Sequence, residues 1–117
     1  MRKNIYRGWS EKVGLLEPGK FKVGSDVDGV LNGFIFDDDD VPIHLELTQY
    51  IGINDKKGKM IFENDIVKLK KRGMDFTGVV KFSNGAFWIL AKNGSVCIHF
   101  FTKLSKLEVI GNTYERW

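Results

Sequence analysis

The sequence of 117 residues predicts a mainly β protein built from short antiparallel strands. Its 13 glycines lie between short apolar runs, as a chain with many tight turns requires. Asn84-Gly85 and Asn93-Gly94 each separate two apolar segments, and Asn-Gly is the strongest local signal for a β-hairpin. No apolar period of 3.6 residues persists for three turns, so helices are not expected to build the core.

The first 47 residues predict a β-hairpin region. Strands are expected over residues 3–9, 20–23, 30–36 and 41–47. The last of these is the clearest, because every second residue from Val41 to Leu47 is apolar and would face the same side of a sheet. Asp28-Gly29 is a frequent hairpin dipeptide and predicts a turn before the third strand.

Residues 48–117 predict a meander of short strands. We expect strands over residues 50–53, 60–62, 65–71, 76–82, 87–90, 96–101 and 107–110, and one helical turn over residues 102–106. Five strands joined by tight turns are typical of a small SH3-like barrel. The expected organisation is a single domain over residues 1–117, with an N-terminal β-hairpin region at 1–47 and an SH3-like β region at 48–117.

Charge and composition exclude several classes of protein. The net charge is +3, and it would be +7 without the run from Asp37 to Asp40, which permits but does not demand binding to nucleic acid. A single cysteine, Cys97, excludes an internal disulfide and fits a reducing cytoplasm. No signal peptide is visible, and no apolar stretch reaches the roughly 18 residues of a membrane span. We therefore expect a cytoplasmic protein without a membrane partner.

The segment SDVDGVLNG, residues 25–33, is similar to the nucleophile motif of haloacid-dehalogenase-type phosphatases. In that family the first Asp, here Asp26, attacks phosphorus and the second, here Asp28, acts as general acid and base. The fold needs a buried parallel strand before the nucleophile. Here Lys20 and Lys22 alternate with apolar residues, which indicates a half-exposed strand. We therefore interpret the segment as a hairpin turn.

Two other groups of residues have the chemistry of a site. The run Asp37–Asp40 offers ligands for a hard cation, but it lacks the spacing of a calcium loop and favours a solvated turn. Cys97 and His99 lie on one face of a predicted strand, where a nucleophile pair is conceivable, yet a packed thiol is commoner. With only one further histidine, His44, no closed tetrahedral metal site is expected. We expect no catalytic residue, no metal and no cofactor.

The only basic cluster contains the candidate binding residues. It comprises Lys68, Lys70, Lys71 and Arg72, and Phe76 and Trp88 are its candidate stacking partners. Lysines along a strand next to an aromatic residue suit the backbone and bases of a nucleic acid. The simpler interpretation is a solvated strand end whose charges discourage aggregation at a sheet edge.

Residues 47–67, LTQYIGINDKKGKMIFENDIV, resemble the signature of the YopX family, small proteins of phages and prophages. The family pattern is roughly Gln-Tyr-Thr-Gly-Leu-x-Asp-x-x-Gly-x-x-Ile-Tyr-Glu-Gly-Asp-Ile-Val. This chain matches it at Gln49, Tyr50, Gly52, Asp55, Gly58, Ile61, Glu63, Asp65, Ile66 and Val67. Segments at Ile5–Trp9, Gly78–Phe87 and Glu108–Glu115 are also similar to the family and stand in the same order.

Two positions depart from the pattern. Asn64 replaces a usual Gly, and Asn tolerates the left-handed backbone conformation that a Gly would adopt there. Ile51 replaces a usual Thr, which removes a hydroxyl group. The motif has the character of a scaffold: Gly52 and Gly58 suit turns, and Asp65 is expected to cap the amides of a tight corner.

The resemblance implies a mostly β fold, a phage or prophage origin and self-association, and it implies no established activity. We therefore expect a non-enzymatic binding protein in the bacterial host cytoplasm, a homo-oligomer whose partner is a host or phage protein. The alternative is a nucleic-acid-binding accessory protein that uses Lys68 to Arg72. The sequence does not identify the partner.

Overall fold

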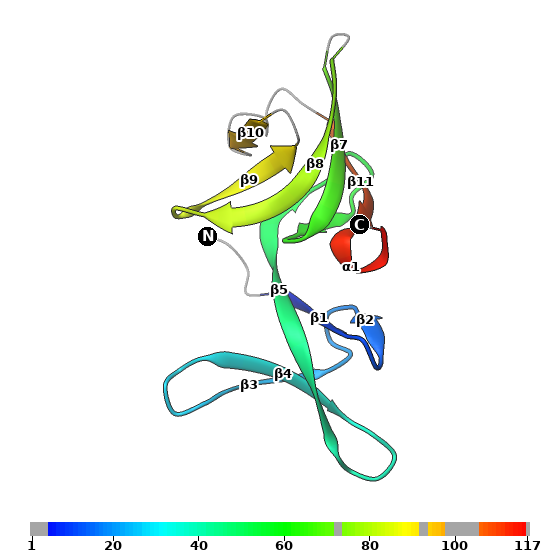
Figure 1. Cartoon of the computed structure of the whole chain (residues 1–117), viewed down its shortest axis with the longest axis vertical. Coiled ribbons are helices and arrows are strands. Elements are labelled where there is room, and N and C mark those ends of the chain that lie inside the picture. The colour runs from blue at the N-terminus through cyan, green and yellow to red at the C-terminus, as the bar shows by residue number, and fades with distance from the viewer. Residues whose placement is uncertain (1–4, 72–73, 92–93, 98–105, 117) are drawn as a thin grey trace. The chain divides into compact units, whose positions relative to one another are not determined.

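The computed structural model describes residues 5–71, 74–91, 94–97 and 106–116 (Figure 1), with the backbone alone at 70–71, 74–75, 95–97, 106 and 115–116. The strands are β1 Tyr6–Ser10, β2 Gly14–Leu16, β3 Lys22–Ser25, β4 Leu31–Phe36, β5 Pro42–Asn54, β6 Met60–Phe62, β7 Asp65–Lys71, β8 Met74–Ser83, β9 Ala86–Ala91, β10 Gly94–Cys97 and β11 Lys106–Asn112. A single helical turn, α1, covers Thr113–Arg116. The pairings between these strands are antiparallel, so the predicted mainly β fold is confirmed.

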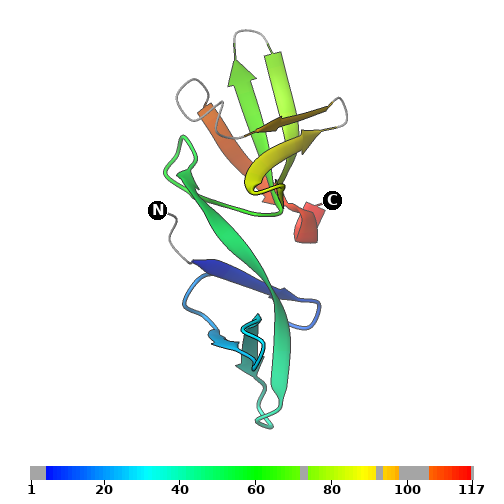
Figure 2. The same ribbon diagram turned by 90° about the vertical axis from the view of Figure 1, so that its left-hand side faces the viewer.

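The chain divides into two compact units within β5. We call Asn4–Gln49 the N-terminal unit and Tyr50–Trp117 the C-terminal unit. The sequence analysis placed a boundary between residues 47 and 48, at the end of the alternating segment. In the structure β5 continues as one strand from Pro42 to Asn54 through this position (Figure 2). Within the described part of the chain, no helix has the length and apolar character needed to cross a membrane.

The N-terminal unit contains a sheet in the order β2-β1-β5-β4-β3. The hairpin of β3 and β4 pairs Lys22 with Phe34, and β4 continues the sheet by pairing Phe34 with His44 on β5. Two glycines let large side chains approach the sheet. A Cβ on Gly33 would lie 2.4 Å from Leu47 Cδ2, and one on Gly8 would lie 2.9 Å from Leu45 Cδ1 and 3.3 Å from Phe21 Cε1.

The C-terminal unit contains a five-stranded meander in the order β10-β9-β8-β7-β11. Its core is apolar and almost fully buried, and it comprises Ile51, Ile61, Val67, Leu69, Val80, Phe87, Ile89 and Leu107. The predicted turn at Asn84-Gly85 is confirmed, because Ser83 pairs with Ala86 and both turn residues have positive φ. The described pairings leave the sheet open between β10 and β11, so an SH3-like barrel is not confirmed.

Three local features differ from the sequence prediction. The strand β2 and the turn α1 were not anticipated, because three or four residues are too short to show a period. The break expected near residue 47 is absent, and the irregularity lies further along, where the pairing of β5 with β6 shifts between Tyr50 and Asn54. Gly52 has a φ of 90° within that shift, which a glycine adopts without strain. The helical turn predicted at residues 102–106 lies outside the described residues.

Candidate functional site

The basic cluster lies on β7, and Lys68 is its only member with a described side chain. Lys68 is partly buried and pairs with Thr77 on β8 and with Glu108 on β11. The backbones of Lys70 and Lys71 pair with Asp75 and Met74. The side chains of both lysines, and the whole of Arg72, are outside the described part of the chain.

The structure places Trp88 on the same face of the sheet as Lys68 but not beside it. Trp88 on β9 pairs with Lys81, which lies four residues along β8 from Thr77, the partner of Lys68. Four residues of strand span roughly 13 Å. The Trp88 indole N–H donates to the Ser83 carbonyl at 3.0 Å, which fixes the ring over its own hairpin.

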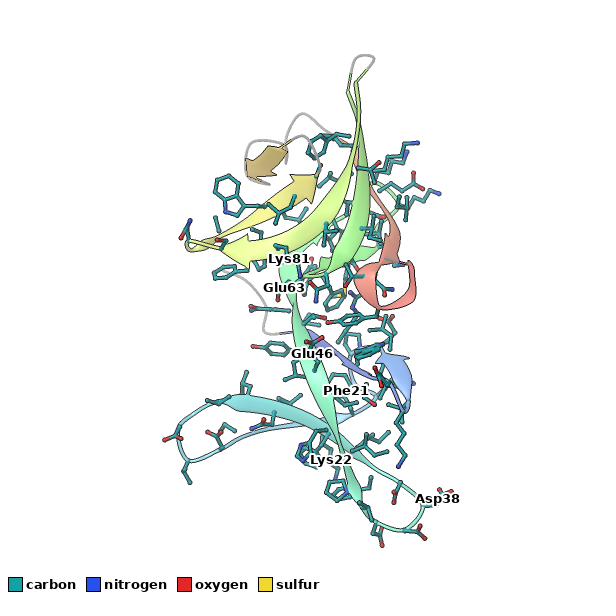
Figure 3. All side chains as sticks on the ribbon, viewed as in Figure 1. Phe21, Lys22, Asp38, Glu46, Glu63 and Lys81 are labelled. Carbon is teal, nitrogen blue, oxygen red and sulfur yellow. The ribbon has the colours of Figure 1, made fainter. Side chains whose placement is uncertain are left out.

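Lys81 is therefore the lysine nearest to Trp88 by register, and the sequence analysis did not identify it. Its Nζ donates to Asn64 Oδ1 at 2.5 Å, so the amine is held at the corner before β7 (Figure 3). The signal was present in the sequence. A two-residue Asn-Gly turn fixes the register of its hairpin, and counting back from Ser83 and Ala86 pairs position 81 with position 88.

Asp26 lies in a hairpin turn, as the sequence analysis expected. Its Oδ1 accepts hydrogen bonds from the backbone N–H groups of Asp28 at 2.9 Å and Val30 at 3.0 Å. Gly29 has a φ of 79°, and its N–H donates to the Asp26 carbonyl at 3.0 Å. The strand before Asp26 is exposed and antiparallel to β4, in contrast to the buried parallel strand of a haloacid-dehalogenase fold. The carboxylate shapes a turn.

The acidic run repeats the same turn. Asp37 Oδ1 accepts from the N–H groups of Asp39 and Val41, each at 2.9 Å. Asp40 has a positive φ of 60°, and it occupies the position that Gly29, also with positive φ, occupies in the first turn. Hydrogen bonding by Val41 holds the pKa of Asp37 below its ordinary value. The side chain of Asp38 projects from the tip of the turn (Figure 3), so the predicted solvated acidic turn is confirmed.

The remaining candidate chemistry is not assembled in the described structure. His44 is exposed on β5, and the Cys97 backbone pairs with Trp88. The Cys97 side chain and all of His99 lie outside the described part of the chain. Among described residues, no group of three or more His, Cys, Asp and Glu side chains is placed to hold a metal ion.

The third turn of this type begins at Asp55 and extends beyond its own hairpin. Asp55 Oδ1 accepts from the N–H groups of Lys57 and Lys59, and Oδ2 accepts from the N–H of Val109 on β11 at 3.0 Å. Burial raises the pKa of Asp55, but hydrogen bonds from Val109, Lys59 and Lys57 outweigh burial and hold the pKa below its ordinary value. The Asp55 carboxylate therefore joins the β5–β6 turn to the last strand.

Ion pairs reinforce the junction between this turn and β11. The carboxylate of Glu108 lies 2.9 Å from Lys57 Nζ and 3.4 Å from Lys56 Nζ. Hydrogen bonds from Lys57 and Lys56 hold the pKa of Glu108 below its ordinary value, and the same contact with Glu108 raises the pKa of Lys57. All three side chains reach solvent, so the pairs contribute little to stability individually.

The corner at residues 62–65 confirms two predictions about the signature. Asp65 is fully buried, and its Oδ2 accepts from the Phe62 N–H at 2.9 Å, so Asp65 caps the corner as expected. Asn64 has a φ of 72°, the left-handed conformation expected where the family uses Gly. Its side chain also donates to the Tyr114 hydroxyl at 2.8 Å. The signature residues described here hold strands together.

The exposed apolar side chains concentrate in the N-terminal unit. Of the large apolar residues described as exposed, six lie between positions 23 and 41: Val23, Val27, Val30, Leu31, Phe36 and Val41. Two grooves of about 400 and 330 Å³ lie in the same unit and share Gly19 and Phe21 as lining residues.

The formal charges are also unequal. Residues 4–49 contain 4 Lys and Arg against 9 Asp and Glu, a formal charge of −5. Residues 50–117 contain 12 Lys and Arg against 6 Asp and Glu, a formal charge of +6. The basic character of the chain therefore belongs to the C-terminal unit, and the N-terminal unit is acidic.

These features define a small all-β protein whose prominent side chains serve turns, strand junctions and exposed surface. The family model described as "YopX protein" matches residues 20–116, and the chain belongs to the YopX family. The X-ray crystal structure of protein yopX from Bacillus subtilis is similar, with a TM-score of 0.66 and 20% sequence identity. The match covers 96% of this chain and 94% of that chain and shows a common fold. No curated protein matches the sequence.

Proposed function

We propose that this chain is a phage- or prophage-encoded, non-enzymatic binding protein of the bacterial cytoplasm that acts on a host or phage protein. The observation that carries the proposal is the imbalance of apolar side chains in the N-terminal unit. Among its described large apolar residues, Leu45 alone is buried, whereas six are exposed between positions 23 and 41. A unit of 46 residues needs most of its apolar surface for its own core, so an excess of exposed apolar side chains favours a protein partner.

A capture experiment tests this function. The tagged chain is incubated with host lysate, treated with nuclease and cross-linked, and the retained proteins are identified by mass spectrometry. Val23→Thr with Val41→Thr removes two exposed apolar side chains and keeps β-branched residues. Leu90→Thr with Ile110→Thr is the matched control, because those side chains are exposed to a similar extent in the C-terminal unit.

We expect wild type and the control to retain the same protein after nuclease, and the double variant in the N-terminal unit to lose it. A retained set no different from that of an unrelated tagged protein contradicts the proposed function. Equal retention by all three chains contradicts the assignment to the N-terminal unit.

The charge of the C-terminal unit favours a second candidate function, nucleic-acid binding. A formal charge of +6 on residues 50–117 attracts phosphate, and Lys68 and Trp88 share one face of the sheet. Binding is measured by fluorescence anisotropy with a labelled single-stranded oligonucleotide and a duplex between 50 and 200 mM salt. We expect affinity to fall steeply with salt. Lys68→Ala should reduce the slope of log K against log salt concentration by about one, the value for one phosphate contact.

The control for this second function is Lys12→Ala, because Lys12 is an exposed lysine of the acidic N-terminal unit. Trp88→Ala should weaken binding to the single strand more than to the duplex, since stacking requires an unpaired base. Binding that is absent, or that does not change with salt, contradicts nucleic-acid binding.

Self-association is part of the primary proposal. The described pairings end at β2 and β3 in one sheet and at β10 and β11 in the other, and open strand edges can pair between copies. Light scattering over a range of concentrations measures the mass in solution. We expect a mass above that of one chain, and a monomer mass throughout contradicts self-association.

A further inference from the structure

The edge strand β3 is open to a further strand. β3 ends the sheet order of the N-terminal unit, and each of its residues, Lys22 to Ser25, is exposed. On its inner side it pairs with β4, and the described residues provide no partner strand on its outer side. It contains no proline and no bulge, two of the devices that blunt the edges of natural sheets, although it is only four residues long and carries Lys22. Its outer backbone groups can therefore pair with an extended chain.

Two apolar grooves share Phe21, just before this strand, as a lining residue. The larger groove is lined by Ile5, Tyr6, Pro18, Gly19, Phe21, Val23 and Leu31, all of which are uncharged. The smaller groove has aromatic walls, since Phe34 and Phe36 pack edge to face with ring centres 5.5 Å apart. Phe21 lines both grooves and packs close to Gly8, since a Cβ on Gly8 would lie 3.3 Å from Phe21 Cε1. Side chains of a bound strand would thus find apolar sites beside the backbone edge.

The lining of the smaller groove includes positively charged residues, although the N-terminal unit as a whole has a negative formal charge. The only charged residues lining the two grooves are Lys20 and Lys22, within a unit of formal charge −5. In the described structure neither lysine forms an ion pair, and Lys22 Nζ lies 5.9 Å from the centre of the Phe36 ring (Figure 3). Two cations without acidic partners at the rim of an apolar groove are complementary to a carboxylate.

We propose that β3 and its two grooves bind an extended acidic peptide segment, which adds a strand to the sheet at β3. Apolar side chains of the segment occupy the grooves beside Phe21, and a carboxylate pairs with Lys20 and Lys22. The inference rests on the proposed protein-binding function and names the binding mode and the chemistry of the partner.

The probe is a phage-displayed library of random 12-residue peptides, selected on the immobilised full chain. We expect the enriched peptides to carry acidic residues among alternating apolar ones. For an enriched peptide synthesised with a fluorophore, Lys20→Glu with Lys22→Glu should weaken binding by tenfold or more. Lys12→Glu is the matched control, because Lys12 is an exposed lysine of the same unit outside both grooves, and it should change binding less than twofold.

Strand addition has a test of its own. In a strand that pairs with a sheet edge on one side, every second backbone amide faces that edge and the others face away. N-methylation of alternate amides therefore removes the hydrogen bonds to the edge in one register and leaves them intact in the other, and the side chains are unchanged. We expect the first register to abolish binding and the second to preserve it. Circular dichroism of each protein variant verifies that the fold is retained, as the exposure of Lys20 and Lys22 leads us to expect.

Four results would overturn the inference. Three of them are a library that enriches nothing above background, peptides that bind the charge-reversed variant as well as wild type, and indifference to methylation in both registers. A fourth is a dimer in light scattering that the charge reversal disrupts, since it would assign the edge to a second copy. If the lysate experiment still retains a protein, the peptide mode alone is wrong; if it retains nothing, the proposed function is wrong as well.

Discussion

The Asp55 carboxylate accepts a hydrogen bond from the backbone N–H of Val109, 54 positions later in the chain, at 3.0 Å. The turn that Asp55 forms with Lys57 and Lys59 is the same turn that Asp26 and Asp37 form within the N-terminal unit. Only Asp55 is buried, and in the described structure the second oxygen of Asp55 accepts a hydrogen bond from a distant strand. The same Asp turn thus stabilises its own hairpin at Asp26, Asp37 and Asp55, and at Asp55 it also joins the hairpin to β11.

We predict that Asp55→Asn destabilises the protein by about 1–3 kcal/mol, because an amide that keeps the turn bonds presents its NH₂ group to the Val109 N–H. Asp26→Asn is the matched control, since it alters the same turn at an exposed position and should cost less than about 0.5 kcal/mol. Urea unfolding followed by circular dichroism measures both. Equal losses would contradict the role assigned to Val109.

The same carboxylate makes stability depend on pH. Because hydrogen bonding holds the pKa of folded Asp55 below its ordinary value, the unfolded chain binds more protons than the folded chain near pH 4. The stabilisation is therefore complete above about pH 5 and is lost as the pH falls through the lower, folded pKa. The pKa of Glu108 is lowered too, so it acts in the same direction.

Urea midpoints at pH 7, 5, 4 and 3 check this pH dependence in wild type and in Asp55→Asn. We expect wild type to lose stability towards pH 3 and the variant to lose less, so that the two converge. A difference between wild type and variant that stays constant from pH 7 to pH 3 would show that the charge of Asp55 is not responsible.

Gly78, the glycine within β8, is predicted to resist replacement. A Cβ at this position would lie 2.6 Å from the Leu90 carbonyl oxygen and 2.7 Å from Ile89 Cγ2, and the backbone atom cannot rotate away. Gly78→Ala should therefore cost about 1–3 kcal/mol through overpacking. Gly24→Ala is the control, because its nearest neighbour would be 4.0 Å away. A Gly78→Ala chain as stable as the control in urea would refute this prediction.

The sequence predicted features that depend on nearest neighbours along the chain. The Asn84-Gly85 turn fixes a register by itself, and Asp65 caps amides three residues away. It could not predict that Asp55 reaches Val109, because nothing local distinguishes Asp55 from Asp26. It also could not predict that β5 keeps its extended backbone through the position where one compact unit ends.

The candidate site shows the same limit. The sequence analysis grouped Trp88 with the basic cluster, but the register separates Lys68 and Trp88 by roughly four residues of strand. The grooves beside Phe21 depend on glycines at positions 8 and 19 and on two strands that meet only in the folded sheet. The periodicity of a sequence can predict which face of a strand is exposed. A groove cannot be predicted in this way, because it forms only where separate strands and loops come into contact.

At position 64 this chain has Asn where the family usually has Gly, and the hydrogen bonds of the Asn64 side chain are expected to offset the backbone strain that Gly would avoid. Asn64 has a φ of 72°, which favours glycine, yet its side chain accepts from Lys81 Nζ and donates to the Tyr114 hydroxyl. Asn64→Gly keeps the backbone geometry and loses both bonds, whereas Asn64→Ala loses both bonds and adds left-handed strain of order 1 kcal/mol.

We therefore expect Asn64→Ala to be less stable than Asn64→Gly by about 1 kcal/mol, and both to be less stable than wild type. Lys81→Met separates the contributions, since it removes one of the two bonds and leaves the backbone at Asn64 unchanged. Urea unfolding of the three variants gives the comparison. If Asn64→Gly is more stable than wild type, the two side-chain bonds do not offset the strain of an asparagine at this corner, and the family's glycine is simply the better residue there.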